Sequence, residues 1–157
     1  MDAHFILDSL KRHWPKAAIV PELTIRDELH LAYGDSVAHH AWTRRIDALM
    51  IQSLERTAIE IKVTRADFSR EHHQKWAPWV RVCHRFIYAV PAGLIEPREV
   101  WEIGGEYSAG LVYVHEDGRV ETVRKCRPNK HPEHLPQHVI QNLAYRAAGR
   151  SAIEGDS

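Results

Sequence analysis

Two short apolar segments, residues 44–52 (RRIDALMIQ) and 56–63 (RTAIEIKV), are separated by only three residues. This spacing predicts two antiparallel strands joined by a tight turn. The second segment carries Glu60 and Lys62 in its middle, although the residues around them are typical of a buried strand. Positions i and i+2 of a strand share one face of the sheet. Because an unpaired buried charge is strongly unfavourable, these two side chains must either find partners or serve a function.

Asp47 brings a third charge into the same hairpin, again between apolar neighbours. Facing residues of an antiparallel pair have a constant sum of residue numbers. A two-residue loop at residues 53–54 therefore makes Asp47 face Glu60, and a four-residue loop makes it face Lys62. Either loop places the three side chains on one face of the sheet, whereas a loop with an odd number of residues would not.

An acidic pair beside a lysine suggests a metal-dependent site. Two carboxylates within a few ångströms repel each other, and a divalent cation removes that penalty. Oxygen ligands with room for waters suit Mg²⁺ or Mn²⁺. A neighbouring lysine can orient the attacking water or stabilise negative charge on a phosphoryl group. The alternative interpretation is an ordinary ion pair on a solvated face of the sheet, since short charged motifs often have no catalytic role.

The remaining pattern predicts an α/β fold, in which a mixed sheet of four or five strands is flanked by helices. Helices are expected at residues 2–14, from Thr64 onwards, at 96–102 and at 135–148, and further strands at 84–90, 111–114 and 119–123. Residues 17–32 are ambiguous between strand and helix, and residues 34–42 are expected to form a loop. Thr64 with Asp67 has the pattern of a capping box, and Pro78 is expected to kink the helix that follows or to start a second one.

Composition limits the class of protein. The chain has 157 residues, which predicts a single domain over residues 1–150 and a frayed tail over 151–157. Lys plus Arg and Asp plus Glu both number 21, so bulk positive charge does not drive binding, although a local basic patch remains compatible with this balance. We find no apolar run of membrane-spanning length, no secretion signal and only two cysteines. We therefore expect a cytoplasmic protein without membrane interactions.

The charged hairpin resembles a known enzyme family. Asp47, followed by Glu60-Ile61-Lys62 and the string VTRADF, resembles the PD-(D/E)XK nuclease superfamily. The extended string EIKVTRADF, with HRFIYAVP downstream, looks like the MmcB-like DNA repair proteins of bacteria and phages. The resemblance covers about residues 44–95. It implies a restriction-endonuclease-like fold and a metal-dependent nuclease that hydrolyses DNA phosphodiester bonds in repair or recombination.

The resemblance also implies roles for individual residues. Asp47 and Glu60 would bind Mg²⁺ or Mn²⁺, and Lys62 would be the catalytic lysine. We expect the carbonyl of Ile61 as a further metal ligand. The superfamily often adds a glutamate from the first helix or from the segment after it, and the candidates here are Glu22 and, alternatively, Glu28.

Basic and aromatic residues surround the motif. Four of them, Arg44, Arg45, Arg65 and Lys75, are expected to contact DNA phosphates. Trp76 either stacks on a DNA base or belongs to the core, and Trp79 is expected in the core. A second basic patch is predicted in the loop at residues 124–130.

Three other hypotheses stand beside the nuclease. The residues Cys126, His131, His134 and His138 form a conceivable zinc set, although Pro132 and Pro136 interrupt the segment. A catalytically inactive module of the same fold could bind DNA or a repair partner. A homodimer is also compatible with a nuclease that cuts both strands of a duplex.

Overall fold

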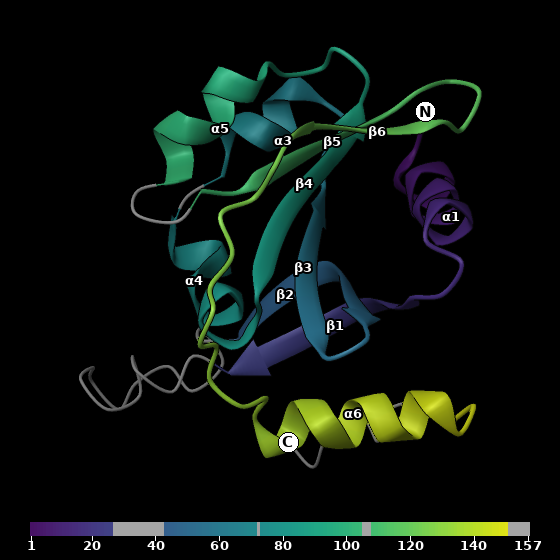
Figure 1. Ribbon diagram of the computed structural model, residues 1–157, viewed down its shortest axis with the longest axis vertical. Helices are drawn as coiled ribbons and strands as arrows, with labels where there is room; N and C mark the ends of the chain where they lie inside the picture. Colours follow the sequence, from purple (N-terminus) through teal and green to yellow (C-terminus); the bar gives the residue numbers. More distant parts are fainter. Residues whose placement is uncertain (27–42, 72, 105–107, 151–157) are drawn as a thin grey trace.

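The computed structural model describes residues 1–26, 43–71, 73–104 and 108–150. Its elements are α1 (Ala3–His13), β1 (Ala18–Arg26), β2 (Thr43–Gln52), β3 (Glu55–Ile61), α3 (Arg65–Ser69), α4 (His73–Val82), β4 (Arg85–Pro91), α5 (Pro97–Gly104), β5 (Gly110–Val114), β6 (Val120–Arg124) and α6 (Gln137–Ala147). Together they form an α/β fold with a six-stranded mixed sheet flanked by helices (Figure 1). Within these ranges, no helix combines the length and the apolar character needed to cross a membrane.

The strands lie in the sheet in the order of the sequence, from β1 to β6. The pairs β1–β2, β2–β3 and β5–β6 are antiparallel. The pairs β3–β4 and β4–β5 are parallel, and parallel neighbours require crossover connections. The connection from β3 to β4 contains α3 and α4, and the connection from β4 to β5 contains α5.

The sheet is larger than the predicted four or five strands because the ambiguous segment forms a strand. β1 pairs with β2 from Ala18 opposite Ile51 to Arg26 opposite Thr43. This pairing joins segments distant in sequence, so local patterns could not settle it. Pro21 is tolerated because β1 is an edge strand of the sheet.

The β2–β3 hairpin has the shorter of the two loops considered from the sequence. Gln52 faces Glu55, so residues 53 and 54 form a two-residue loop. The ladder continues from there to the pair Ala48 and Ile59. This register is the one in which Asp47 and Glu60 occupy facing positions.

The segment after β3 begins as predicted and then differs. Thr64 caps α3, and its Oγ1 accepts a hydrogen bond from the Asp67 N–H at 3.1 Å. α3 ends at Ser69, and a second helix, α4, begins at His73, so the break does not lie at Pro78. Pro78 instead lies inside α4. Burial of Trp76 and Trp79 on either side of it supports the helix there, because packing outweighs local propensity.

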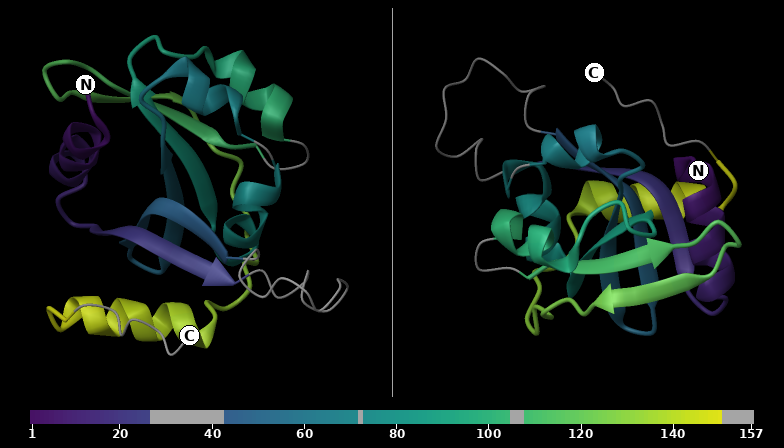
Figure 2. Two further views of the ribbon diagram at one scale, coloured as in Figure 1. Left: turned by 180° about the vertical axis from the view of Figure 1, so that it is seen from behind. Right: turned by 90° about the horizontal axis from the view of Figure 1, so that it is seen from above.

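Helices cover both faces of the sheet, and α6 lies along β1 (Figures 1 and 2). Alternate residues of the central strands point to opposite faces. The face that packs against Phe68, Trp76 and Trp79 carries Leu49, Ala58, Tyr88 and Leu111. The face that packs against α1 carries Ala48, Ile59, Ala89 and Val112. Glu60 and Lys62 follow Ala58 at steps of two, so they belong to the face towards α3 and α4.

Candidate functional site

The pairing between β2 and β3 ends where the charged residues begin. Beyond the pair Ala48 and Ile59, the Ile61 N–H donates to Oδ2 of Asp47 at 2.7 Å rather than to a backbone carbonyl of β2. On its other side, the Lys62 N–H donates to the Ala89 carbonyl at 3.1 Å and keeps the chain attached to β4. The Asp47 carboxylate therefore takes the place of the backbone carbonyl that would accept the next hydrogen bond of the β2–β3 ladder.

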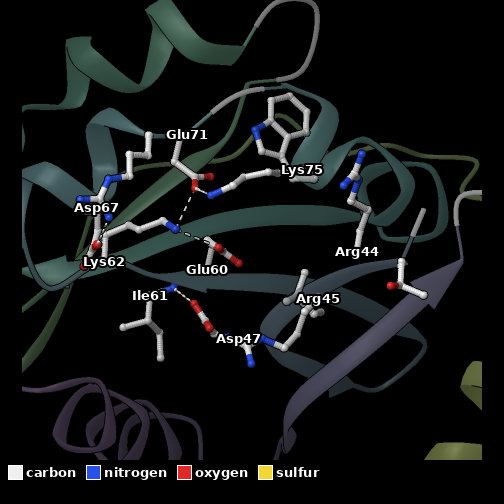
Figure 3. A pocket seen from close by; sticks show the side chains of 13 residues that line it. Arg44, Arg45, Asp47, Glu60, Ile61, Lys62, Asp67, Glu71 and Lys75 are labelled. Carbon is white, nitrogen blue, oxygen red and sulfur yellow. Dashed lines mark hydrogen bonds and ion pairs between the residues drawn. The ribbon is translucent and has the colours of Figure 1, made fainter. Parts of the chain in front are cut away.

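A cavity of about 430 Å³ lies over this point. Asp47, Glu60, Ile61 and Lys62 all line it, together with side chains from α3, α4 and the segment between them. Figure 3 shows Asp47 and Glu60 on neighbouring strands, with Lys62 extending between Glu60 and Glu71. The three charged residues of the predicted hairpin thus share one cavity, as its register implies.

The Lys62 ammonium is held between two carboxylates. Its Nζ lies 2.9 Å from Oε1 of Glu60 and 2.7 Å from Oε1 of Glu71. The side chains of Lys62 and Glu60 are only 9% and 14% exposed, so an ion pair on a solvated face is not what the strand carries. Burial alone would lower the pKa of Lys62, but the charges of Glu60 and Glu71 outweigh it and raise that pKa above its usual value.

Glu71, between α3 and α4, is a member of this cluster that sequence reasoning missed. Its side chain is 1% exposed. Besides Lys62, it contacts the Lys75 ammonium at 3.2 Å and accepts a hydrogen bond from the Tyr88 hydroxyl at 3.1 Å. The sequence does contain a signal that Glu71 faces the core. Residues 68, 71, 75 and 79 have helical spacing, and the first and last of them, Phe68 and Trp79, are buried aromatic residues. This signal was overlooked because Glu71 and Lys75, at i and i+4, also have the pattern of an ordinary ion pair on the surface of a helix.

Burial and repulsion together oppose ionisation of the acidic pair. Burial, followed by the charge of Asp47, raises the pKa of Glu60 to about 7, although Lys62 acts in the opposite direction. Burial also raises the pKa of Asp47, against the Ile61 N–H bond and the charges of Lys62 and Arg45. Two carboxyl groups with raised pKa values in one cavity are typical of functional sites.

The donor set of the cavity fits a hard divalent cation. In the described part of the chain, no group of three or more His, Cys, Asp or Glu side chains could hold a metal. However, Mg²⁺ keeps several waters and needs only one or two carboxylates from the protein. Asp47 and Glu60 supply these, and their raised pKa values indicate that added positive charge is favourable there. The Ile61 carbonyl points to the same neighbouring strand as its N–H, which is the side of Asp47.

The histidine-rich segment does not form the conceivable zinc set. Cys126, His131, His134 and His138 all lie in the described part of the chain, where no group of three or more His, Cys, Asp or Glu side chains could hold a metal ion. His138 has a different partner, because its Nε2 accepts a hydrogen bond from the Arg26 N–H at 3.1 Å.

Three of the four predicted DNA-contacting residues line the cavity, namely Arg44, Arg45 and Lys75. Arg70, another basic residue close to the motif in the sequence, lines it as well. Arg65 does not, since its guanidinium contacts Glu99 at 2.5 Å and the Leu94 carbonyl at 2.7 Å. It lines a different cavity, next to α5.

Glu22, the first candidate for the fourth acid, lies on β1 across from Asp47. It is exposed, and its backbone has a φ of 54°, in the left-handed region. Together with Asp47 and Ile61 it lines a separate cavity of about 380 Å³ beside α1. Glu22 therefore borders Asp47 but not Glu60 or Lys62. Glu28, the alternative, lies outside the described residues.

Both tryptophans of α4 are core residues. Trp79 is fully buried and donates its indole N–H to the Arg44 carbonyl at 3.0 Å. Trp76 is 4% exposed and packs on Phe86 with a centroid distance of 5.5 Å. Although Trp76 contributes to the cavity wall, it offers no exposed ring for base stacking. In the predicted second basic patch, Arg124 donates to the Pro97 carbonyl at 2.9 Å.

No protein-family model matches the chain, and no curated protein matches it. Among solved structures, the chain is similar to the SPO1766 protein of unknown function from Silicibacter pomeroyi, with a TM-score of 0.56 and 23% sequence identity. The similarity covers 94% of this chain and 84% of that chain. At this identity the likeness concerns the fold alone, and it supports a mixed sheet flanked by helices.

Proposed function

We propose that the protein is a metal-dependent nuclease with a restriction-endonuclease-like fold that hydrolyses DNA phosphodiester bonds. The observation that carries the proposal is the open cavity lined by Asp47 of β2, Glu60 of β3 and Lys62 directly after β3. An assignment to DNA repair or recombination rests on the sequence resemblance to the MmcB-like proteins.

Stability alone is a poor reason for such a cluster. Two charges removed from water lose hydration, and their mutual attraction often fails to compensate. Apolar residues on these strands would serve the core equally well. Glu60, whose pKa is about 7, is held in an environment that opposes its ionisation. A functional requirement explains why the strand retains these side chains.

Asp47 and Glu60, with the Ile61 carbonyl, would hold Mg²⁺ or Mn²⁺. Such an ion supplies Lewis-acid polarisation of a phosphodiester and acidifies water. Lys62 would position the attacking water and offset the negative charge that develops on the phosphate. The basic residues of the cavity wall, Arg45 and Lys75 among them, would hold the phosphates on either side of the scissile bond.

A cleavage assay tests the proposal directly. Labelled single-stranded, duplex and branched DNAs are incubated with the protein in Mg²⁺, in Mn²⁺ and in EDTA. We expect cleavage of at least one of these DNAs with either metal and none in EDTA. Binding to these DNAs without cleavage under any of these conditions would instead support the catalytically inactive module.

Two variants locate the activity in the cavity. Asp47→Ala and Glu60→Ala should abolish cleavage together with Mn²⁺ binding measured by calorimetry. Glu116→Ala is the matched control, because Glu116 is an exposed glutamate in the β5–β6 turn. Cleavage that survives in the Asp47 and Glu60 variants would place the activity in a contaminant or at another site.

A further inference from the structure

We propose that Glu71 is a positioning residue that keeps the Lys62 ammonium in the cavity when Glu60 is drawn to a cation. The inference rests on the proposed nuclease function. It assigns a role to a buried carboxylate that the metal site does not use.

Glu71 is the more deeply buried of the two carboxylates that hold Lys62. Lys62 Nζ is closer to Glu71 than to Glu60, at 2.7 Å against 2.9 Å. The Glu71 side chain is also less exposed, at 1% against 14% for Glu60. The charge of Glu60 raises the pKa of Lys62 more than that of Glu71 does, but the burial of Glu71 keeps its pair with Lys62 away from water, where charges interact more strongly.

Glu60 has two competing tasks if the cavity binds a metal. Its Oε1 receives the Lys62 ammonium, and the same carboxylate would be a metal ligand. A cation at Glu60 would repel the ammonium and weaken its hold on that carboxylate. Without a second counter-ion, Lys62 would become an unpaired charge in a buried position, which is strongly unfavourable. Glu71 supplies that counter-ion from outside the metal site.

Glu71 is itself held from two sides. The Tyr88 hydroxyl donates to Oε2 of Glu71, while the ammonium of Lys75, four residues further along the chain, contacts Oε1. Tyr88 lies on the central strand β4 and packs against Phe68 with a centroid distance of 5.6 Å. The carboxylate thus has one oxygen bound to the sheet and the other directed at Lys62. This arrangement suits a residue that orients another one.

Proton–nitrogen NMR of the lysine ammonium groups tests the anchor without any nuclease assay. Exposed ammonium protons exchange with water too quickly to be seen, whereas a buried, ion-paired group is protected. The chain has six lysines, and loss of a signal in Lys62→Met identifies the one from Lys62. We expect this signal in the parent protein and in Glu60→Gln, and its loss in Glu71→Gln. A signal that persists in Glu71→Gln, or that is missing from the parent, would overturn the inference.

Kinetics test what the anchor does. Glu71→Gln should lower kcat about 100-fold, the usual effect of misplacing a reacting group by about 1 Å, and should leave KM for DNA nearly unchanged. Calorimetric Mn²⁺ binding should be retained, because Asp47 and Glu60 are intact. Glu55→Gln is the matched control, since it removes the charge of a glutamate at the start of β3 that is ion-paired with Arg85. An unchanged kcat in Glu71→Gln would contradict the positioning role.

A double variant covers the case in which Glu71→Gln does not fold. If Glu71 acts through Lys62, Lys62→Met/Glu71→Gln removes both charges and should restore a cooperative unfolding transition. Failure of the double variant to fold would show that Glu71 is required for its other contacts and would refute the proposal. If the parent protein does not cleave DNA, the proposed function is wrong. The NMR comparison would still show whether Glu71 holds Lys62, because it does not depend on cleavage.

Discussion

At the scale of single residues, Glu60 is where burial and charge conflict in this protein. Its carboxyl group is buried beside Asp47 and yet faces the ammonium of Lys62. The two neighbours pull its pKa in opposite directions, and burial decides the outcome by raising it to about 7. The pH dependence of stability follows from this balance.

The metal-free protein should lose stability as the pH rises from about 4.5 to about 7. The folded state binds the Glu60 proton more tightly than the unfolded state, so the stabilising contribution is complete below the unfolded pKa and is lost as the pH passes the folded one. A shift of the Glu60 pKa from 4.5 to about 7 corresponds to at most about 3 to 4 kcal/mol. Denaturant unfolding across this range should show a smaller decrease for Glu60→Gln. Equal slopes in the two proteins would mean that Glu60 ionises normally.

Lys62→Met should retain binding of DNA and of Mn²⁺ while kcat falls by orders of magnitude. The ammonium acts most strongly on charge that exists only in the transition state, so its loss affects turnover more than binding. Single-turnover cleavage and DNA titration measure the two effects separately. Lys16→Met, at an exposed lysine, is the matched control. A Lys62→Met protein that cleaves like the parent would reduce Lys62 to a structural ion-pair partner.

At the scale of secondary structure elements, β1 contains a local distortion next to the site. Glu22 has a φ of 54°, and the Arg146 guanidinium of α6 donates to the carbonyls of Pro21 and Glu22. The distortion lies where β1 faces Asp47, because Pro21 pairs with Ala48 and Leu23 pairs with Ile46. α6 therefore supports the backbone that borders one side of the candidate site.

Glu22→Gly should raise the free energy of unfolding by about 0.5 to 1 kcal/mol. The left-handed conformation costs a non-glycine residue about 1 to 2 kcal/mol, and the greater chain entropy of glycine in the unfolded state offsets part of the gain. Glu22→Ala is the control, because it removes the same side chain and keeps the backbone penalty. Both variants should retain more cleavage activity than Glu60→Ala, since Glu22 does not line the cavity that holds Lys62. Loss of cleavage as complete as in Glu60→Ala would make Glu22 the fourth acid.

At the scale of the whole molecule, charge is distributed unevenly although its sum is zero. The cavity brings the carboxylates of Asp47, Glu60 and Glu71 together around Lys62. Basic side chains from β2 and α4 line the same cavity. If the proposed function holds, these basic side chains would attract a polyanion locally without the bulk positive charge of a general nucleic-acid binder.

DNA affinity should therefore depend on salt, and the dependence should come from the cavity. Each phosphate contact contributes about 0.9 to the slope of log K against log salt for duplex DNA. Arg45→Ala should reduce the slope by about one contact, since Arg45 lines the cavity. Arg65→Ala should leave it nearly unchanged, because Arg65 is paired with Glu99. Fluorescence anisotropy at several salt concentrations measures both slopes, and equal losses would place Arg65 on the DNA path.

The sequence by itself determined the features that depend on short-range geometry. The period of two along a strand places Asp47, Glu60 and Lys62 on one face with either loop that the sequence allows, and the structure has the two-residue loop, in which Asp47 faces Glu60. The cap at Thr64 is equally local, since donor and acceptor are three residues apart.

Only the tertiary structure decided the features that depend on contacts between distant segments. β1 is a strand because β2 offers it a partner, and the sheet gained its sixth strand in that way. The crossover between parallel strands places Glu71 over Lys62, while Arg65, only a few residues away, turns to Glu99. A glutamate four residues before a lysine has the same sequence pattern on the surface and in a buried site. Packing of α3 and α4 on the sheet distinguishes the two, because it removes water from one carboxylate and leaves a buried lysine as its partner.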